Sequence, residues 1–153
     1  MIIAAIDLLL HSMEQADVKA FQEKFGVPMA DVPSLLTQPV YDFRLKFLHE
    51  ELQEFADAHG ANDLPKAADA LVDLAYVLHG TALMMGLPWE KLWNEVHRKN
   101  MEKVRATHES QSARQSTLDV VKPEGWTPPD HTVILGRGPW PVFDPLQKEE
   151  VLS

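Results

Sequence analysis

The chain has 153 residues, which is enough for one domain with a hydrophobic core but short for two. A formal net charge of −9 argues against a nucleic-acid polymer as partner, because phosphate backbones are bound by clustered Lys and Arg; a nucleotide accompanied by divalent cations stays compatible. The absence of cysteine excludes disulfides, thiolate zinc sites and cysteine nucleophiles.

The first ten residues, Met1 to Leu10, are apolar but do not read as a targeting segment. They include Asp7, and they lack a basic n-region and a small-residue cleavage site. The stretch is also too short to span a bilayer. We therefore expect a cytoplasmic protein with no membrane partner.

Two helices are expected in the first sixty residues. The first runs from about Ile6 to Phe25 and ends at Gly26, a residue typical of the position after a helix C-terminus. Residues 27–40 contain three prolines and are expected to be an extended connector. The second helix spans roughly Val40 to His59.

Two more helices follow, and then the composition changes. The third begins near Asn62 or Asp63 and runs to Met85, and Pro88 opens a fourth that continues to about Arg105. Residues 107–153 hold six of the eleven prolines and are expected to be mostly irregular, with a short strand at Thr132–Leu135. The sequence predicts an all-α helical bundle with a catalytic domain at 1–106 and a Pro-rich tail at 107–153 that packs on the bundle or on a partner subunit.

Three carboxylates border or enter the apolar face of the second helix. With about 100° per residue, Phe43 and Leu52 mark an apolar arc of about 180°, and Glu51 falls inside it at about 80°. Glu50 and Glu54 lie near the edge of that arc at about 340° and 20°. A solvated acidic edge, with Lys46 paired to Glu50, would explain Glu50 or Glu54 alone, but it does not explain Glu51.

The third helix places two more carboxylates on one face. Asp69 and Asp73 are four residues apart, and the run that follows Asp69 is apolar nearly all round, which predicts a buried helix. No Lys or Arg occurs between Lys66 and Lys91, so a buried Asp73 has no local cation. One alternative pairs Asp73 with a side chain that can neutralise or hydrogen-bond it: Arg44, Lys46, Tyr76 or His79.

A divalent cation would neutralise all five side chains together. Mg²⁺, or Mn²⁺ in its place, prefers carboxylate oxygens and usually binds substrate phosphates as well. Two antiparallel helices could bring the five groups to a site for one or two ions: Glu50, Glu51, Glu54, Asp69 and Asp73.

The same segments resemble the all-α nucleoside triphosphate pyrophosphohydrolases, a superfamily that includes MazG-like proteins, phosphoribosyl-ATP pyrophosphohydrolase and the dimeric dUTPases. The resemblance rests on an ordered set of elements over roughly residues 17–130: the end of the first helix at Phe21–Pro28, the EExxE element at His49–Glu54, the acidic segment Asp69–Val77 followed by Gly80-Thr81, the helix Glu95–Lys103 and the loop Gly125–Asp130. One departure is that the family usually shows Glu-x-x-Asp on its third helix, whereas position 70 is Ala here.

The resemblance implies that water attacks the α-phosphorus of a nucleoside triphosphate, releasing a monophosphate and pyrophosphate. Mg²⁺ would neutralise the triphosphate, and Glu51 or Glu50 would accept a proton from the attacking water. Further residues are expected to contact phosphate, sugar or base: Arg98, Asn100, Lys103 and Trp126. The expected substrate is a dNTP, with dUTP, a damaged nucleotide or phosphoribosyl-ATP as the other options.

The sequence also predicts an oligomer and leaves two alternative functions open. The apolar third helix and the Trp-bearing fourth helix carry more hydrophobic surface than a small bundle hides, and the resemblance implies a homodimer or a dimer-of-dimers tetramer. Two alternatives to the enzyme are a protein-interaction module that uses the Pro-rich tail and a nucleotide binder that does not hydrolyse its ligand.

Overall fold

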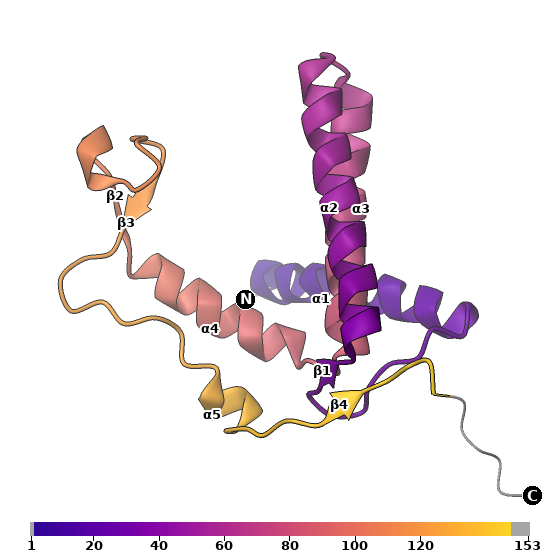
Figure 1. The fold of residues 1–153 in the computed structure, drawn as a ribbon. Coiled ribbons are helices and arrows are strands. Elements are labelled where there is room, and N and C mark those ends of the chain that lie inside the picture. The colour runs from indigo at the N-terminus through magenta and orange to yellow at the C-terminus, as the bar shows by residue number, and fades with distance from the viewer. Residues whose placement is uncertain (1, 148–153) are drawn as a thin grey trace, which may run out of the picture. The chain divides into compact units, whose positions relative to one another are not determined.

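The structure is a computed structural model that describes residues 2–147, with side chains described from Met13 onward. The described chain contains five α-helices, and four of them are long (Figure 1): α1 (Ile2–Lys24), α2 (Gln38–Gly60), α3 (Leu64–Met84), α4 (Trp89–Met101) and α5 (Thr132–Leu135). Four strands of two residues each form two small ladders: β1 (Leu35–Leu36), β2 (Val104–Arg105), β3 (Val120–Val121) and β4 (Val142–Phe143). The predicted all-α class with about four main helices is confirmed.

The chain forms two compact units. The hairpin unit contains α1, α2, α3 and both strands of the β1–β4 ladder, and the α4 unit spans Pro88–Gly138. This grouping differs from the expected boundary after residue 106, because α4 belongs with the segment that follows it. A catalytic role confined to residues 1–106 stays a prediction.

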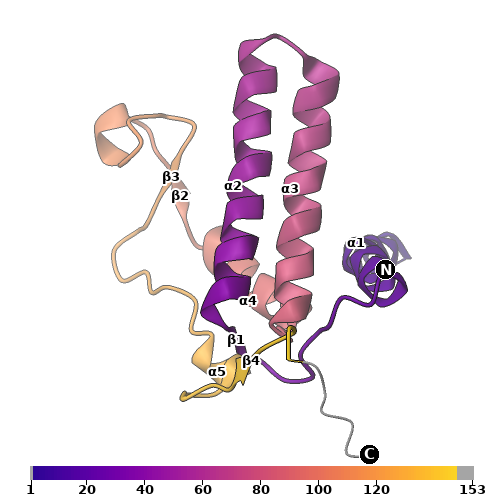
Figure 2. The same cartoon turned by 45° about the vertical axis from the view of Figure 1, so that its right-hand side comes forward.

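In the hairpin unit, α2 and α3 lie side by side and antiparallel (Figure 2). The turn between them ends at Asp63, whose carboxylate accepts a hydrogen bond from the Lys66 N–H and caps α3. The buried stripe of α2 consists of four residues at spacings of four and seven: Val40, Arg44, Glu51 and Ala58. The buried residues of α3 include several small side chains, which allow the two helices to approach closely: Ala67, Ala70, Gly80 and Ala82.

A buried polar network joins α1, α2 and α3. Arg44 donates from Nη2 to the Val77 carbonyl at 2.7 Å and from Nε to Thr81 Oγ1 at 3.0 Å. From α1, Gln22 donates to the Gly80 carbonyl at 3.2 Å. A Cβ at Gly80 would lie only 3.2 Å from Arg44 Nη2, so glycine leaves room for the guanidinium. The Gly80-Thr81 pair therefore has a structural role in packing the three helices.

The connector between α1 and α2 is extended, as predicted, and also forms a strand that the sequence did not reveal. β1 pairs in parallel with β4, and Leu35 lies opposite Val142. The last described part of the tail thus packs on the hairpin unit. Gly86 follows α3 with φ +62°, in close contact with the carbonyls of Ala30 and Val32.

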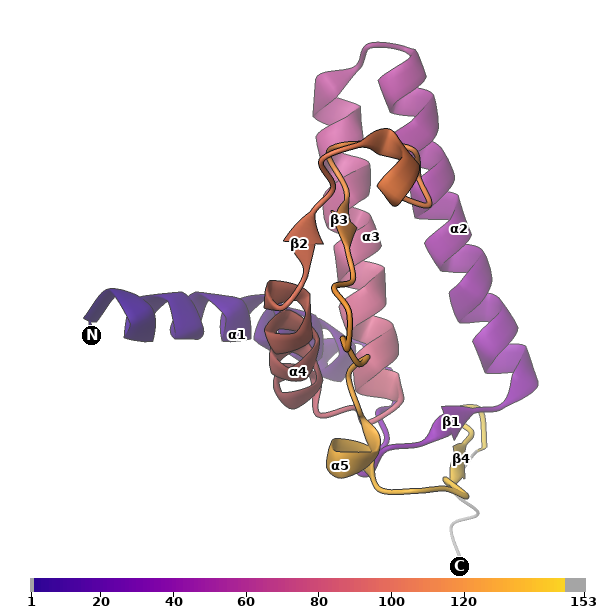
Figure 3. The same cartoon turned by 90° about the vertical axis from the view of Figure 1, so that its left-hand side faces the viewer.

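In the α4 unit the fourth helix is shorter than expected. It ends at Met101 and not near Arg105, because Val104 and Arg105 leave the helix to pair with Val121 and Val120 in the antiparallel β2–β3 ladder (Figure 3). The loop beyond β2 includes a 3₁₀ turn, η1 (Glu109–Gln111).

The short strand predicted at Thr132–Leu135 is wrong, since these residues form α5. The Asp130 carboxylate accepts hydrogen bonds from the Thr132 N–H at 3.0 Å and from its hydroxyl at 2.6 Å. This local turn immediately precedes the short helix, and the local hydrogen bonding overrides the preference of Thr, Val and Ile for strands. The rest of residues 107–147 is mostly irregular, as expected.

The prediction that α3 is buried nearly all round is wrong for the single chain. Leu71 and Val72 are 48% and 64% exposed, because α3 packs on α2 along one face and on α1 over a short stretch. By length and composition alone α3 could cross a membrane, with a mean hydropathy of 1.2. Core helices of soluble proteins have the same composition, so this is weak support for a membrane span.

Candidate metal and phosphate sites

The five predicted metal ligands lie on the paired helices α2 and α3, but only one is buried. Glu51 is 8% exposed and lies in the middle of the buried stripe of α2, as its helical position predicted. The other four carboxylates are exposed: Glu50, Glu54, Asp69 and Asp73.

Burial and like charges both act on Glu51. Burial is the largest effect that raises the pKa of its carboxyl group, because a charged carboxylate loses hydration there. The four neighbouring carboxylates raise the pKa further, in the order Glu54, Asp73, Glu50 and Asp69. The predicted ligands of both helices are therefore close enough to repel Glu51, and among the described residues no cation lowers its pKa.

Nothing among the described side chains neutralises this group of carboxylates. None of the hydrogen bonds and ion pairs between described residues involves any of the five. Arg44, the alternative partner considered for Asp73, instead binds Val77 and Thr81 further along α3. It precedes Glu51 by seven residues, or roughly 10 Å along the helix.

The carboxylate oxygens of these five residues are suitable ligands for a hard divalent cation, but their arrangement is not a complete coordination site. All five ligands are carboxylate oxygens, the preferred donors of Mg²⁺. Among the described residues, no three His, Asp or Glu side chains lie close enough together to hold an ion as they stand. The four exposed carboxylates have solvent beside them and are free to change rotamer. The metal set stays a prediction.

Ala70 lies on the buried face of α3, at the position where the family usually carries an acidic residue. Ala70 is 3% exposed and lies on the buried face of α3, while the neighbouring Asp69 is exposed. The acidic residue that the family usually carries at this position would thus lie in the α2–α3 contact. Asp69 lies outside that contact and acts on Glu51 least of the four neighbours.

Of the predicted substrate contacts, Arg98 is already engaged by two carboxylates. Its guanidinium donates to both oxygens of Glu95 at 2.8 and 2.9 Å and to Glu102 at 2.9 Å. These bonds and charges raise the pKa of Arg98, with the Glu95 hydrogen bond as the largest cause. Contact with a phosphate would require Arg98 to exchange one of these partners.

The other three predicted contacts lie together at the C-terminal end of α4. Lys103 donates to the side-chain carbonyl of Asn100 at 2.8 Å, and its ammonium lies 5.4 Å from the centre of the Trp126 ring. Trp126 donates from Nε1 to the Lys99 carbonyl at 2.9 Å. This bond anchors the Pro-rich segment to α4, so the indole also has a packing role.

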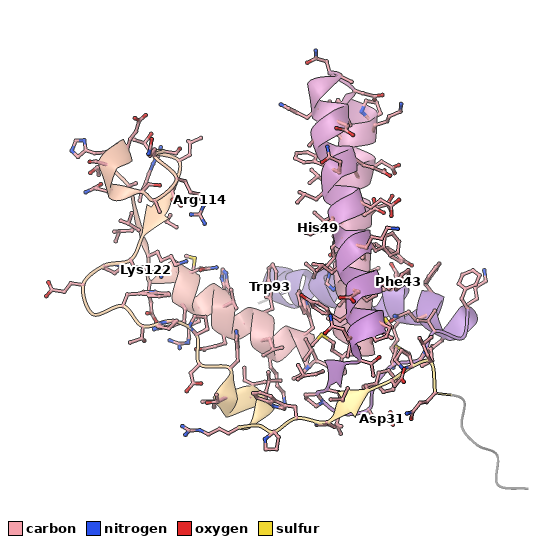
Figure 4. The ribbon with its side chains drawn as sticks, in the orientation of Figure 1. Asp31, Phe43, His49, Trp93, Arg114 and Lys122 are labelled. Carbon is pink, nitrogen blue, oxygen red and sulfur yellow. The ribbon has the colours of Figure 1, made fainter. Side chains whose placement is uncertain are left out.

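Two lysines in this group were missed as site residues. Lys99 is 7% exposed and forms an ion pair with Glu102, and its ammonium lies 5.8 Å from the Trp126 ring centre. The ammonium of Lys122 lies 4.9 Å from the same centre. Figure 4 labels Lys122. Lys99 lies in the last turn of α4 and Lys103 lies two residues beyond the helix end, whereas Lys122 comes from the segment after β3 and is brought in by the β2–β3 pairing.

Comparison with known families gives one match. The sequence model of the family described as phosphoribosyl-ATP pyrophosphohydrolase matches residues 18–100, more than half of the chain. The matched region contains all five carboxylates, Arg98 and Asn100, and it ends before Lys103 and Trp126. No curated protein matches the chain in sequence.

Proposed function

Because the chain belongs to the phosphoribosyl-ATP pyrophosphohydrolase family, within the MazG-like NTP pyrophosphohydrolase superfamily, we propose that it hydrolyses a nucleoside triphosphate to the monophosphate and pyrophosphate in the presence of Mg²⁺. One observation carries the proposal beyond the family: Glu51 is buried without a cationic partner and is repelled by carboxylates from two helices. A buried carboxylate in that position costs free energy, and a divalent cation would offset that cost.

In this proposal the ligands of the metal are Glu51 together with the exposed carboxylates of α2 and α3: Glu50, Glu54, Asp69 and Asp73. Mg²⁺, when bound, supplies positive charge to the triphosphate and polarises its P–O bonds. Mn²⁺ substitutes because it accepts the same oxygen donors.

The protein's own part in the reaction is to position a water and to receive its proton. Glu51, or Glu50 beside it, takes a proton from the water as the water oxygen forms a bond to the α-phosphorus and the bond to the leaving pyrophosphate breaks. Glu51 is proposed for this role because its carboxylate is buried between the two helices that carry the other acidic residues.

The preferred substrate in this proposal is a dNTP, and Arg98, Asn100, Lys103 and Trp126 are its proposed contacts. A cytoplasmic homodimer or tetramer is proposed with it. Exposed apolar side chains on α2 and α3 support self-association: Phe43, Leu52, Leu71 and Val72. Phe43 is labelled on α2 in Figure 4.

A phosphate-release assay with added inorganic pyrophosphatase tests the proposal over all NTPs, all dNTPs and phosphoribosyl-ATP, with and without Mg²⁺. Release that requires Mg²⁺ is expected in at least one well. Glu51→Gln should reduce it by a hundredfold or more while the helical circular dichroism signal is retained, and Glu90→Gln, on exposed α4 surface, should leave it unchanged. No release from any substrate would contradict the hydrolase proposal and favour a nucleotide binder or interaction module.

A further inference from the structure

Three ammonium groups surround one indole in the α4 unit. The Nζ atoms of Lys99, Lys103 and Lys122 lie 5.8, 5.4 and 4.9 Å from the centre of the Trp126 ring. The ring is fixed by its hydrogen bond to the Lys99 carbonyl. Cation–π attraction stabilises each lysine modestly, but it does not remove the repulsion among three like charges.

Two of these lysines lie at the same end of a strand ladder, each one residue beyond it. Val104 pairs with Val121 and Arg105 with Val120, and Lys103 and Lys122 are the residues that flank the Val104–Val121 pair. Two like charges brought together at the end of a strand pair repel each other. This arrangement becomes favourable when an anion lies between the two ammonium groups.

The carboxylates nearby leave the cluster with excess positive charge. Lys99 pairs with Glu102, which also binds Arg98. Among the described residues, no carboxylate lies within ion-pair distance of Lys103 or Lys122. In a chain of net charge −9, two adjacent lysines without acidic partners are available for an external anion.

We propose that Lys122 and Lys103 bind an oligophosphate anion beside Trp126, with Lys99 adding a buried positive charge behind them. Ammonium groups bind phosphate oxygens as point charges and need no fixed bidentate geometry, which suits a pyrophosphate or polyphosphate group. The identity of the anion rests on the proposed function, in which a triphosphate is the substrate and pyrophosphate the product. Lys122, in the segment after β3, is thereby added to the proposed substrate contacts.

Binding of inorganic pyrophosphate without divalent cations tests this site directly, with isothermal titration calorimetry of the full chain at low salt. Lys122→Gln and Lys103→Gln should each weaken pyrophosphate binding at least fivefold. Lys91→Gln removes the same charge from an exposed part of α4 and should change the affinity less than twofold. Lys122→Arg keeps the charge and should retain binding within about threefold.

Unchanged pyrophosphate affinity in Lys122→Gln would overturn the proposal. An equal loss of affinity in Lys91→Gln would also overturn it, because the effect would then depend only on net charge. If Lys122→Gln fails to fold by circular dichroism, Lys122→Arg and Lys103→Gln carry the comparison. Glu51→Gln separates the site from the hydrolase proposal: it should abolish turnover and leave metal-free pyrophosphate binding intact. Wild-type chain that binds pyrophosphate through Lys122 but hydrolyses nothing would contradict only the hydrolase.

Discussion

Arg44 on α2 donates a hydrogen bond from Nε to the hydroxyl of Thr81 on α3 over 3.0 Å, and its Nη2 reaches the Val77 carbonyl. These bonds hold the buried guanidinium against α3, about two helical turns before Glu51 on α2. Burial lowers the pKa of Arg44. The guanidinium therefore links α2 to α3 through neutral acceptors and forms no ion pair with the described carboxylates.

Replacing Arg44 should destabilise the hairpin unit. Arg44→Met removes both hydrogen bonds to α3 and is expected to cost about 1–3 kcal/mol in the free energy of unfolding. Arg44→Lys should recover less than half of this loss, because one ammonium cannot reproduce the two-pronged geometry. Urea unfolding followed by circular dichroism measures both variants; a fully stable Arg44→Lys would argue against a geometric role.

A pair of glycine variants tests the contact at the end of α3. In Gly86→Ala the new Cβ would lie 2.5 Å from the Val32 carbonyl oxygen at a φ of +62°, so we expect a loss of at least about 2 kcal/mol. In Gly60→Ala the Cβ meets nothing within 4 Å at the end of α2. That control should be neutral or more stable by up to about 1 kcal/mol. Similar melting temperatures for both variants would contradict the prediction.

The loop between β2 and β3 should respond to acid through Asp119. A hydrogen bond from Ser112 at 2.6 Å is the largest cause that lowers the pKa of this carboxyl group, followed by the Val120 N–H and Arg114. The folded-state pKa lies below the unfolded one, so the stabilisation is present at neutral pH and is lost as the pH falls through the lowered value. NMR titration should show the Asp119 carboxyl titrating at higher pH in Ser112→Ala; an identical midpoint would exclude the hydroxyl as the cause.

Restoring an acidic residue at position 70 should strengthen metal binding. Ala70→Glu places a carboxylate on the buried face of α3, between the exposed Asp69 and Asp73, where we expect it to cost stability without metal and to act as a ligand with it. We expect a lower melting temperature in chelator, a larger upward shift with Mg²⁺ than in the wild type, and a lower Mg²⁺ requirement for activity. Ala70→Gln is the uncharged control. It should lower the melting temperature in chelator, but it should neither enlarge the shift with Mg²⁺ nor lower the Mg²⁺ requirement for activity.

Local periodicity was sufficient to predict much of this molecule. A turn of about 100° per residue placed Glu51 within the buried stripe of α2 before any tertiary contact was known, and its burial is confirmed. Capping preferences gave a helix start at Asn62 or Asp63, of which Asp63 is the cap, and a glycine stop at Gly26, since each depends only on adjacent backbone.

Features that depend on distant segments were not predictable. Lys122 joins Lys103 only through the β2–β3 ladder, whose strands are two residues long and carry no alternating pattern. The partners of Arg44 are 33 and 37 residues away on α3. The exposure of Leu71 and Val72 likewise depends on how many helices cover α3, which an apolar composition does not specify.

Anomalous X-ray scattering from crystals grown with Mn²⁺ would locate the proposed metal ion itself. We expect a Mn²⁺ peak between α2 and α3, with Glu51 and Asp73 as ligands and the exposed carboxylates turned toward the ion. A structure without a peak there at millimolar Mn²⁺, in which those carboxylates point separately into solvent or pair with basic residues, would contradict it.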